Sequence, residues 1–325
     1  MGFILRRLGF YIAAFWVSIT LNFILPRLMP GDPVSRMVAR LQGEIRPEQV
    51  DALRRSFGLD DSPVLVQYWH YLAKLFSGDM GFSISRFPTP VTTVISGQIG
   101  WTLLLGFSAL IIAVIIGNTL GILAAWRRGG FLDSVLPPIL VFLGSFPYFW
   151  LAMGLLWLFG ITLGWFPLRH AFEAGTSPQL SLAFIGDVAY HLVLPATSIV
   201  LVSIGGWLLG MRNTMIATNA EDYIVMAEAK GLRSNRIMLR YAARNAMLPA
   251  VTAFGMSLGF IVGGALLTEV VFAYPGVGYQ LLQAVQALDY PLMQGLFLTI
   301  TAAVLLANFA VDIVYVRLDP RVRAN

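Results

Sequence analysis

The stretch at residues 100–126, GWTLLLGFSALIIAVIIGNTLGILAAW, decides the class of fold. It is an uninterrupted apolar run, and about 20 apolar residues are enough for a helix to cross the hydrocarbon core of a bilayer. The chain as a whole has the same character: 57% of its residues are hydrophobic, 12% are charged, and its mean hydropathy is +0.74. A soluble domain has about 25% charged residues. We therefore predict an all-α integral membrane protein, with the lipid bilayer as a partner.

Outward from this stretch, the apolar pattern predicts six transmembrane helices. They are expected at residues 8–28, 100–126, 135–160, 192–212, 247–270 and 292–316, each about long enough to cross a bilayer. The first follows Arg6 and Arg7 and has no small-residue cleavage site after a short apolar core. We interpret it as a retained helix rather than a signal peptide. An even number of spans places both termini on the same side.

The basic residues predict the orientation, because Arg and Lys close to spans are retained in the cytoplasm, whereas long loops are largely exempt. A cytoplasmic N-terminus leaves only Arg169 in the two later outer loops. The inner segments then hold Arg6, Arg7, Arg127, Arg128, the run from Arg212 to Arg244, Arg317, Arg321 and Arg323. The net charge of +5 is therefore a topological signal, with both termini cytoplasmic. It gives no reason to expect nucleic acid as a partner.

Three regions follow from this topology. Residues 1–28 form the N-terminus and first helix, residues 29–99 an extracytoplasmic loop, and residues 100–325 a five-helix core with a cytoplasmic loop at 213–246. The outer loop should contain two short helices, one from Pro47 to a stop at Gly58 and one from Ser62-Pro63 to near Gly78. In the second, an apolar stripe recurs near helical spacing at Val64, Tyr68, Tyr71, Leu72 and Leu75. The stripe would either pack on the outer ends of the spans or dock an extracytoplasmic partner.

The cytoplasmic loop contains Glu221-Asp222-Tyr223 and then Ala227-Glu228-Ala229-Lys230-Gly231. Acidic residues suit the positive end of a helix, and a lysine followed by glycine indicates its C-terminal stop. We expect a short helix and a turn outside the membrane. Small Ala227 and Ala229 beside a glycine turn would let another protein approach closely, although a plain connecting loop also fits these residues.

Motifs for catalysis are missing from the sequence. A phosphate-binding loop needs Gly-Lys-Ser/Thr, and neither of the two lysines, Lys74 and Lys230, follows a glycine. None of His70, His170 and His191 belongs to an HExxH motif, and the chain has no cysteine. We therefore expect no enzyme, no catalytic residue, no metal and no cofactor bound by this chain.

A few polar groups lie inside or at the ends of the spans, where charge is costly unless it faces protein or water. Glu269 either accepts hydrogen bonds from the turn at residues 275–278 or, with Phe272, forms a gate or contacts the solute. Asp312 is expected to form a structural ion pair with Arg317. Asn308, four residues earlier, extends that network or faces the translocation path.

Two further expectations concern the last spans. Residues 281–288 could form a short helix that dips back before Pro291. Glycines at Gly255-x-x-x-Gly259-x-x-x-Gly263 permit close approach of two helices, either within the chain or at a seam with a second subunit.

An ordered set of motifs extends over nearly the whole chain. It comprises Pro30-Gly31-Asp32-Pro33; Leu59-Asp60 with Pro63 and Gln67-Tyr68; Gly78-Asp79-Met80-Gly81; Leu194-Pro195; Asp222-Tyr223 leading into Ala229-Lys230-Gly231-Leu232; Arg244-Asn245 with Leu248-Pro249; Glu269, Phe272 and Pro275-Gly276-Val277-Gly278; Asp289-Tyr290-Pro291; and Asn308, Asp312, Tyr315 and Asp319-Pro320-Arg321. On these motifs the chain resembles the permease subunits of the dipeptide, oligopeptide and nickel importers of the ATP-binding-cassette class.

The resemblance implies the type I importer permease fold in a prokaryotic inner membrane. It implies a second paralogous permease subunit, two cytoplasmic ATPase subunits that bind ATP and Mg, and an extracytoplasmic solute-binding protein. Residues from about Glu221 to Gly231 would form a coupling helix that enters a cleft of the ATPase and drives alternating access. The positions of the general Glu-Ala-Ala pattern read Val225-Met226-Ala227 here, so the individual ATPase contacts are not assigned.

The solute implied by the resemblance is a peptide, with nickel or an oligosaccharide as alternatives within the family. A secondary transporter or channel that works without ATP is the alternative from another class. Such carriers often contain an inverted internal repeat, and no convincing repeat relates the two halves of this sequence. An intramembrane enzyme is less well supported, because facing spans present no recognisable nucleophile and base.

Overall fold

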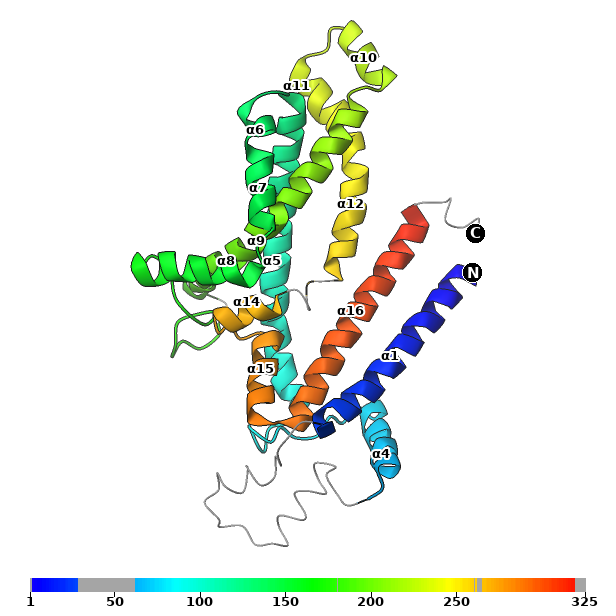
Figure 1. Ribbon diagram of the computed structural model, residues 1–325, viewed down its shortest axis with the longest axis vertical. Helices are drawn as coiled ribbons and strands as arrows, with labels where there is room; N and C mark the ends of the chain where they lie inside the picture. Colours follow the sequence, from blue (N-terminus) through cyan, green and yellow to red (C-terminus); the bar gives the residue numbers. More distant parts are fainter. Residues whose placement is uncertain (1, 29–61, 180, 260, 262–264, 319–325) are drawn as a thin grey trace. The chain divides into compact units, whose positions relative to one another are not determined.

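The computed structural model describes residues 2–28, 62–179, 181–259, 261 and 265–318 (Figure 1). Of residues 2–5, 26 and 314–318 it describes the backbone alone. Within these ranges every regular element is a helix, apart from one isolated bridge between Phe82 and Pro90. The chain divides into two compact units. Unit 1 is Met1–Thr102 with Pro275–Ala310, and unit 2 is Leu103–Tyr274 with Val311–Asn325.

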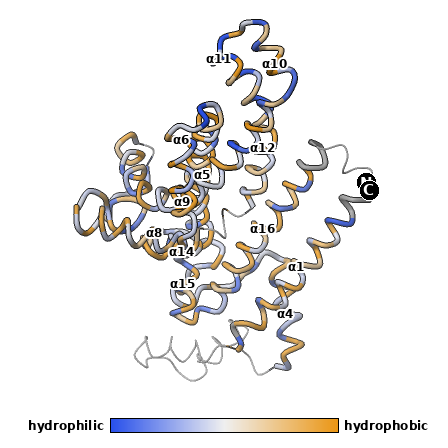
Figure 2. Tube along the Cα trace, turned by 45° about the horizontal axis from the view of Figure 1, so that its top comes forward, coloured by the Kyte–Doolittle hydropathy of each residue, from blue (hydrophilic) through white to orange (hydrophobic). Residues whose placement is uncertain are grey.

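Four helices in the described part are long and apolar enough to cross a membrane. They are α1 (Gly2–Leu28), α5 (Val91–Trp126), α9 (Leu182–Thr218) and α16 (Tyr290–Leu318). Figure 2 shows long hydrophobic stretches along them. Helices α5 and α9 have 36 and 37 residues, well beyond the roughly 20 that a bilayer needs. The predicted spans 100–126 and 192–212 lie within these two helices, which extend beyond them.

The third predicted span, 135–160, is wrong as a single straight helix. The segment consists of α6 (Phe131–Ser134), α7 (Leu136–Gly144), α8 (Tyr148–Leu155) and the π-helical η1 (Leu156–Thr162). The parts Phe131–Gly144 and Tyr148–Thr162 meet at 99°. Pro147 stands at this break with ψ 137°, and its ring disfavours helical backbone at Phe146. The segment is a broken span or a re-entrant loop.

The fifth predicted span, 247–270, is also interrupted. Helix α12 (Arg244–Leu258) has 15 residues and follows α11 (Ser234–Arg236) and the π-helical η2 (Ile237–Ala243). A separate short helix, α14 (Leu266–Val271), comes after a gap in the described residues. The described helices therefore supply four candidate spans, or five with the bent pair, and six stays a prediction.

Unit 1 confirms the helix expected after Ser62-Pro63, which is α4 (Val64–Phe76). The helix expected between Pro47 and Gly58 lies outside the described residues. Leu72 of α4 packs with Ile19 and Leu298, and partly buried residues surround this cluster: Phe15, Tyr68, Tyr71, Leu75 and Met80. Burial raises the pKa of Tyr71 to about 12. Four of the five stripe residues therefore pack on the spans, whereas Val64 is 63% exposed.

A buried carboxylate fixes the corner between α15 (Val277–Ala287) and α16 in unit 1. Asp289 is fully buried, and its Oδ2 accepts hydrogen bonds from Ser83 Oγ, Ser85 Oγ and Ser85 N. Its Oδ1 accepts a hydrogen bond from the backbone N–H of Leu292 at 3.2 Å, which satisfies a free donor at the start of α16. Helix α15 covers residues 281–287 of the short helix expected at 281–288, begins four residues earlier and ends at Ala287.

Glycines bring the helices of unit 2 close together. A Cβ atom at Gly117 would lie 2.5 Å from the Trp207 Cβ, and one at Gly121 would lie 2.6 Å from the Leu208 carbonyl oxygen, so α5 packs closely against α9 at these two glycines. Gly205 of α9 approaches Leu140 of α7 in the same way. The motif that acts within the chain is thus Gly117-x-x-x-Gly121. In the expected motif Gly255-x-x-x-Gly259-x-x-x-Gly263, a Cβ atom at Gly255 would meet nothing within 4 Å, and Gly263 lies outside the described residues.

Candidate functional site

The cytoplasmic loop forms the helix and turn that its sequence predicts. Helix α10 (Asp222–Ala229) begins after Glu221 and ends just before Lys230. Gly231 has φ +70°, which glycine adopts without strain. The N–H of Gly231 donates to the carbonyl of Glu228 at 2.8 Å, and the N–H of Leu232 donates to that of Ala227 at 3.3 Å. This pair of bonds satisfies the last carbonyls of α10 and fixes the direction in which the chain leaves it.

One face of α10 is anchored in the core of unit 2. Ile224 and Ala227 are 2% and 3% exposed. They join a cluster with residues from the ends of α5 and α9, from η2 and from the start of α12: Ala125, Met211, Met215, Ile237, Met238, Ala242, Ala243 and Ala246. Burying an isoleucine side chain contributes about 1.5–3 kcal/mol. Helix α10 is therefore packed against the membrane helices rather than hanging from a flexible loop.

The opposite face of α10 is open. Val225 and Met226 are 57% and 58% exposed, and Figure 1 shows α10 and α11 beyond the ends of α5, α6 and α9. These two residues stand where the general family pattern has Glu-Ala. Ala227 was expected on a docking surface, but it faces the chain's own core. It lies one helical turn from Ile224, on the buried side of α10. Ala229 is exposed.

Side-chain hydrogen bonds hold the loop on both sides of α10. The Trp126 Nε1 at the end of α5 donates to Ser234 Oγ at 3.0 Å. The Asn245 Nδ2 at the start of α12 donates to the Tyr223 hydroxyl at 2.9 Å and to the Tyr241 carbonyl at 3.2 Å. Tyr223 was a site candidate from the sequence. The Trp126–Ser234 and Asn245–Tyr223 hydrogen bonds join residues 108 and 22 positions apart, and no local sequence pattern predicts them.

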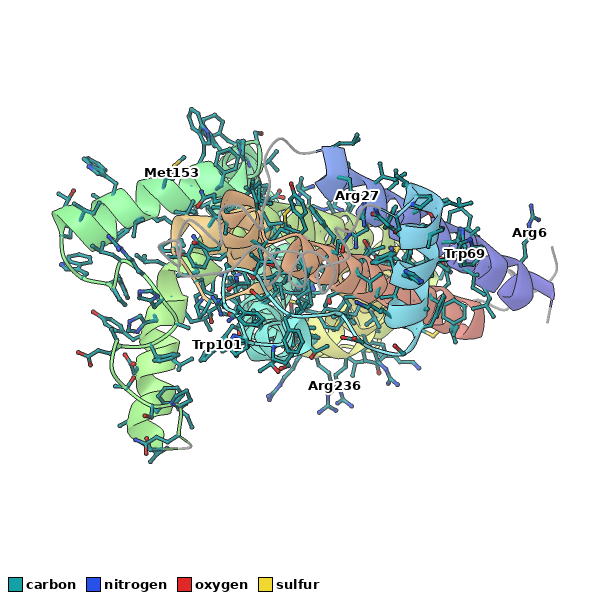
Figure 3. All side chains as sticks on the ribbon, turned by 90° about the horizontal axis from the view of Figure 1, so that it is seen from below. Arg6, Arg27, Trp69, Trp101, Met153 and Arg236 are labelled. Carbon is teal, nitrogen blue, oxygen red and sulfur yellow. The ribbon has the colours of Figure 1, made fainter. Side chains whose placement is uncertain are left out.

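Two hollows flank α10. The smaller, of about 350 Å³, lies against the end of α5 and is lined by Ala125, Trp126, Arg128, Ile216, Asn219, Ala220, Ile224 and Glu228. The larger, of about 800 Å³, follows the Gly231 turn and is lined by Gly231, Leu232, Arg233, Ser234, Asn235, Arg236, Leu239 and Arg240. Figure 3 shows Arg236 extending away from the helices. The loop thus presents apolar side chains on α10 beside a basic hollow.

An ion pair that the sequence did not reveal links α9 to α6. Arg212 Nε lies 2.6 Å from Asp133 Oδ1, with side chains 25% and 10% exposed. Asp133 Oδ2 accepts a hydrogen bond from the Gly129 N–H at 2.9 Å. Because Arg212 lies one residue beyond Met211 of the α10 cluster, this pair connects the base of α10 to the broken span.

Glu269 and Phe272 are both buried in unit 2, at 0% and 1% exposure. The backbone carbonyl of Glu269 accepts a hydrogen bond from the Tyr274 N–H at 2.8 Å. The carbonyl of Phe272 accepts one from the His170 N–H at 3.1 Å, and His170 has φ 66°. Backbone contacts thus fix this corner. A role of Glu269 or Phe272 as a gate stays a prediction.

The remaining candidates lie on α16. Asn308 and Asp312 are half-buried and lie four residues apart along the helix. The side chain of Arg317 lies outside the described residues, so its ion pair with Asp312 stays a prediction. Within the described ranges, no group of three or more His, Asp or Glu side chains could hold a metal ion.

Comparison with known proteins gives matches along nearly the whole chain. Residues 117–324 match the family described as the inner membrane component of binding-protein-dependent transport systems, and residues 1–96 match the N-terminal part of such membrane components. A putative peptide permease protein of Brucella suis biovar 1 (strain 1330) is 39% identical over 313 residues, covering 94% of this chain and 93% of that protein.

Two further relatives cover 99% of both chains. The dipeptide transport system permease protein of Escherichia coli (strain K12) is 35% identical over 340 residues. The glutathione transport system permease protein of Salmonella choleraesuis (strain SC-B67) is 34% identical over 325 residues. With its apolar helices and its short helix anchored at their ends, the chain belongs to the family of inner membrane components of binding-protein-dependent transport systems.

Proposed function

We propose that this chain forms half of the translocation path of an ATP-driven peptide importer and that α10 couples it to the ATPase. One observation carries the proposal. Helix α10 presents Val225 and Met226 to the outside, while Ile224 and Ala227 anchor it on the ends of α5, α9 and η2. A helix with these two faces can receive a push from a partner and transmit it to the membrane.

The route of transmission follows the contacts of unit 2. Movement of α10 displaces α5 and α9 together, because both contribute residues to the cluster that buries Ile224 and Ala227. The two helices also approach each other closely at Gly117 and Gly121. The Asp133–Arg212 pair passes the displacement from α9 to α6. Packed cores transmit strain because they are stiff. Repeated closing and opening of the ATPase would then rock the spans between inward-open and outward-open states.

The chain works as a permease component and is not itself an enzyme; ATP hydrolysis belongs to separate ATPase subunits. A binding-protein-dependent system also contains a solute-binding protein. Our proposal adds the composition and the topology: one paralogous permease, two ATPase subunits that bind ATP and Mg, and both termini in the cytoplasm. A peptide is favoured over nickel or an oligosaccharide, since the relatives named above transport peptides, dipeptides or glutathione by name.

The proposal is tested by purifying the tagged chain gently from its native host and identifying the proteins that accompany it. We expect a second permease and an ATPase, with ATP hydrolysis that rises when the solute-binding protein and its peptide are added. A matched preparation without the tag controls for adventitious ATPases. Recovery of the chain alone, active in liposomes without ATP, would contradict the proposal in favour of a secondary transporter.

A further inference from the structure

Helix α4 has more apolar surface than its packing in unit 1 uses. Tyr68, Leu72 and Leu75 face the cluster with α1 and α16, whereas Leu65, Trp69 and Phe76 are 70%, 60% and 70% exposed. At 3.6 residues per turn, these three exposed residues fall within about 40° of one another around the helix. They form a second apolar stripe beside the buried one.

The polar residues of α4 lie on the side away from this stripe, flanked by the exposed Val64 and Val66. His70 and Lys74 are exposed and lie about 140° and 180° around the helix from Leu65. The exposed stripe itself contains no charged residue. Figure 3 shows Trp69 projecting from α4 rather than lying beneath it. The exposed surface of α4 therefore has an apolar side and a polar side, in addition to the apolar side that packs within unit 1.

Contacts with α1 place α4 at the end of a membrane span. The Tyr68 hydroxyl lies 2.8 Å from Thr20 Oγ1, and Gln67 Oε1 accepts hydrogen bonds from Arg27 Nε and Nη2 at 3.3 and 3.2 Å. The apolar span of α1 runs from Arg6 to Leu25. Thr20 and Arg27 are about 10 Å apart along the helix axis. Helix α4 thus lies at the level where the apolar span of α1 ends at Leu25 and the charged Arg27 follows.

We propose that the stripe Leu65, Trp69 and Phe76 inserts into lipid, so that α4 is an interfacial helix lying at the C-terminal end of α1. Helices of this kind bury their apolar face about 5–10 Å into the boundary between head groups and acyl chains. Tryptophan is enriched at this level, and Lys74 faces the water side. Helix α4 also packs on α1, whose apolar span is only 17% buried within the protein and so leaves most of its surface open to lipid. The depth of the stripe and the position of α4 beside α1 therefore favour lipid as the partner of the stripe. In the proposed topology the stripe enters the outer leaflet.

The test uses the absence of cysteine from this chain, so that a single introduced cysteine gives one label in it. The complete importer carries Leu65→Cys, Trp69→Cys or Phe76→Cys, with His70→Cys and Lys74→Cys as matched controls on the same helix. Each variant is spin-labelled in lipid nanodiscs, next to the unsubstituted complex as the background. Collisions with oxygen, which dissolves in lipid, are compared with collisions with a water-soluble nickel chelate.

We expect oxygen to be favoured at positions 65, 69 and 76 and the nickel chelate at positions 70 and 74. Leu65→Cys keeps Trp69 in place and so remains informative if Trp69→Cys detaches the helix. Equal access of the nickel chelate to all five positions would overturn the proposal. A stripe that becomes shielded only after the solute-binding protein is added would overturn it as well, and would identify a protein docking surface.

Discussion

Replacing Gly121 by alanine should force α5 and α9 apart. The new Cβ would lie 2.6 Å from the Leu208 carbonyl oxygen, 2.8 Å from the Met211 Cβ and 3.0 Å from the Arg212 nitrogen. Carbon atoms in favourable contact are about 3.5–4.0 Å apart, so the helices must separate by about 1 Å. Two of the three opposing atoms belong to the backbone of α9, which cannot rotate away. Overpacking of this kind costs about 1–3 kcal/mol.

The matched control is Gly210→Ala on α9, where an added Cβ meets nothing within 4 Å. Both changes gain the same helix propensity, about 1 kcal/mol, so their difference isolates the packing cost. We expect Gly121→Ala to have a free energy of unfolding about 1–3 kcal/mol lower than Gly210→Ala, measured by denaturant titration of the purified permease in one detergent. Equal stabilities would refute the reasoning that these helices touch through their backbones.

Three further perturbations test other contacts. Asp133→Asn and Arg212→Gln should each lower stability, and a double-mutant cycle should give a coupling energy of about 0.5–3 kcal/mol; additive effects would mean that the pair does not link α9 to α6. Asp289→Ala removes the acceptor of the fully buried Ser83 hydroxyl and of the half-buried donors of Ser85. It should lower the free energy of unfolding by about 1–3 kcal/mol, and an unchanged melting temperature would contradict this role. Glu269→Gln keeps the shape of the side chain, so the gate interpretation predicts altered transport or solute preference at a normal protein level; unaltered transport leaves Glu269 with a structural role.

Local signals in the sequence were sufficient for the short helices. Pro63 predicted the start of α4, and Lys230 followed by Gly231 predicted the end of α10, because each residue acts on the backbone where it stands. Hydropathy also found the long apolar helices. It failed at the third span, since an average over many residues does not register a single break such as the one at Pro147.

The parts of the site that sequence could not supply depend on distant contacts. Asp133 and Arg212 are 79 residues apart, and no sequence pattern around either residue predicts that they form an ion pair. Small residues were visible both at Gly121 and at Gly255, but only the arrangement of helices decides which of them faces a neighbour. Ala227 was expected on a docking face because its small side chain permits close approach, but a small side chain suits a packed core equally well, and there the structure places it.

The central claim, that α10 meets the ATPase, is tested most directly by cross-linking from Met226. Met226→Cys in the assembled importer carries a short photoactivatable cross-linker, and Trp157→Cys, at an equally exposed position on η1, is the matched control. The account predicts a cross-link to the ATPase subunit from position 226 that changes in yield when ATP is bound, and none from position 157. An importer that contains the ATPase and hydrolyses ATP, yet yields no cross-link from position 226 in any nucleotide state, would contradict it.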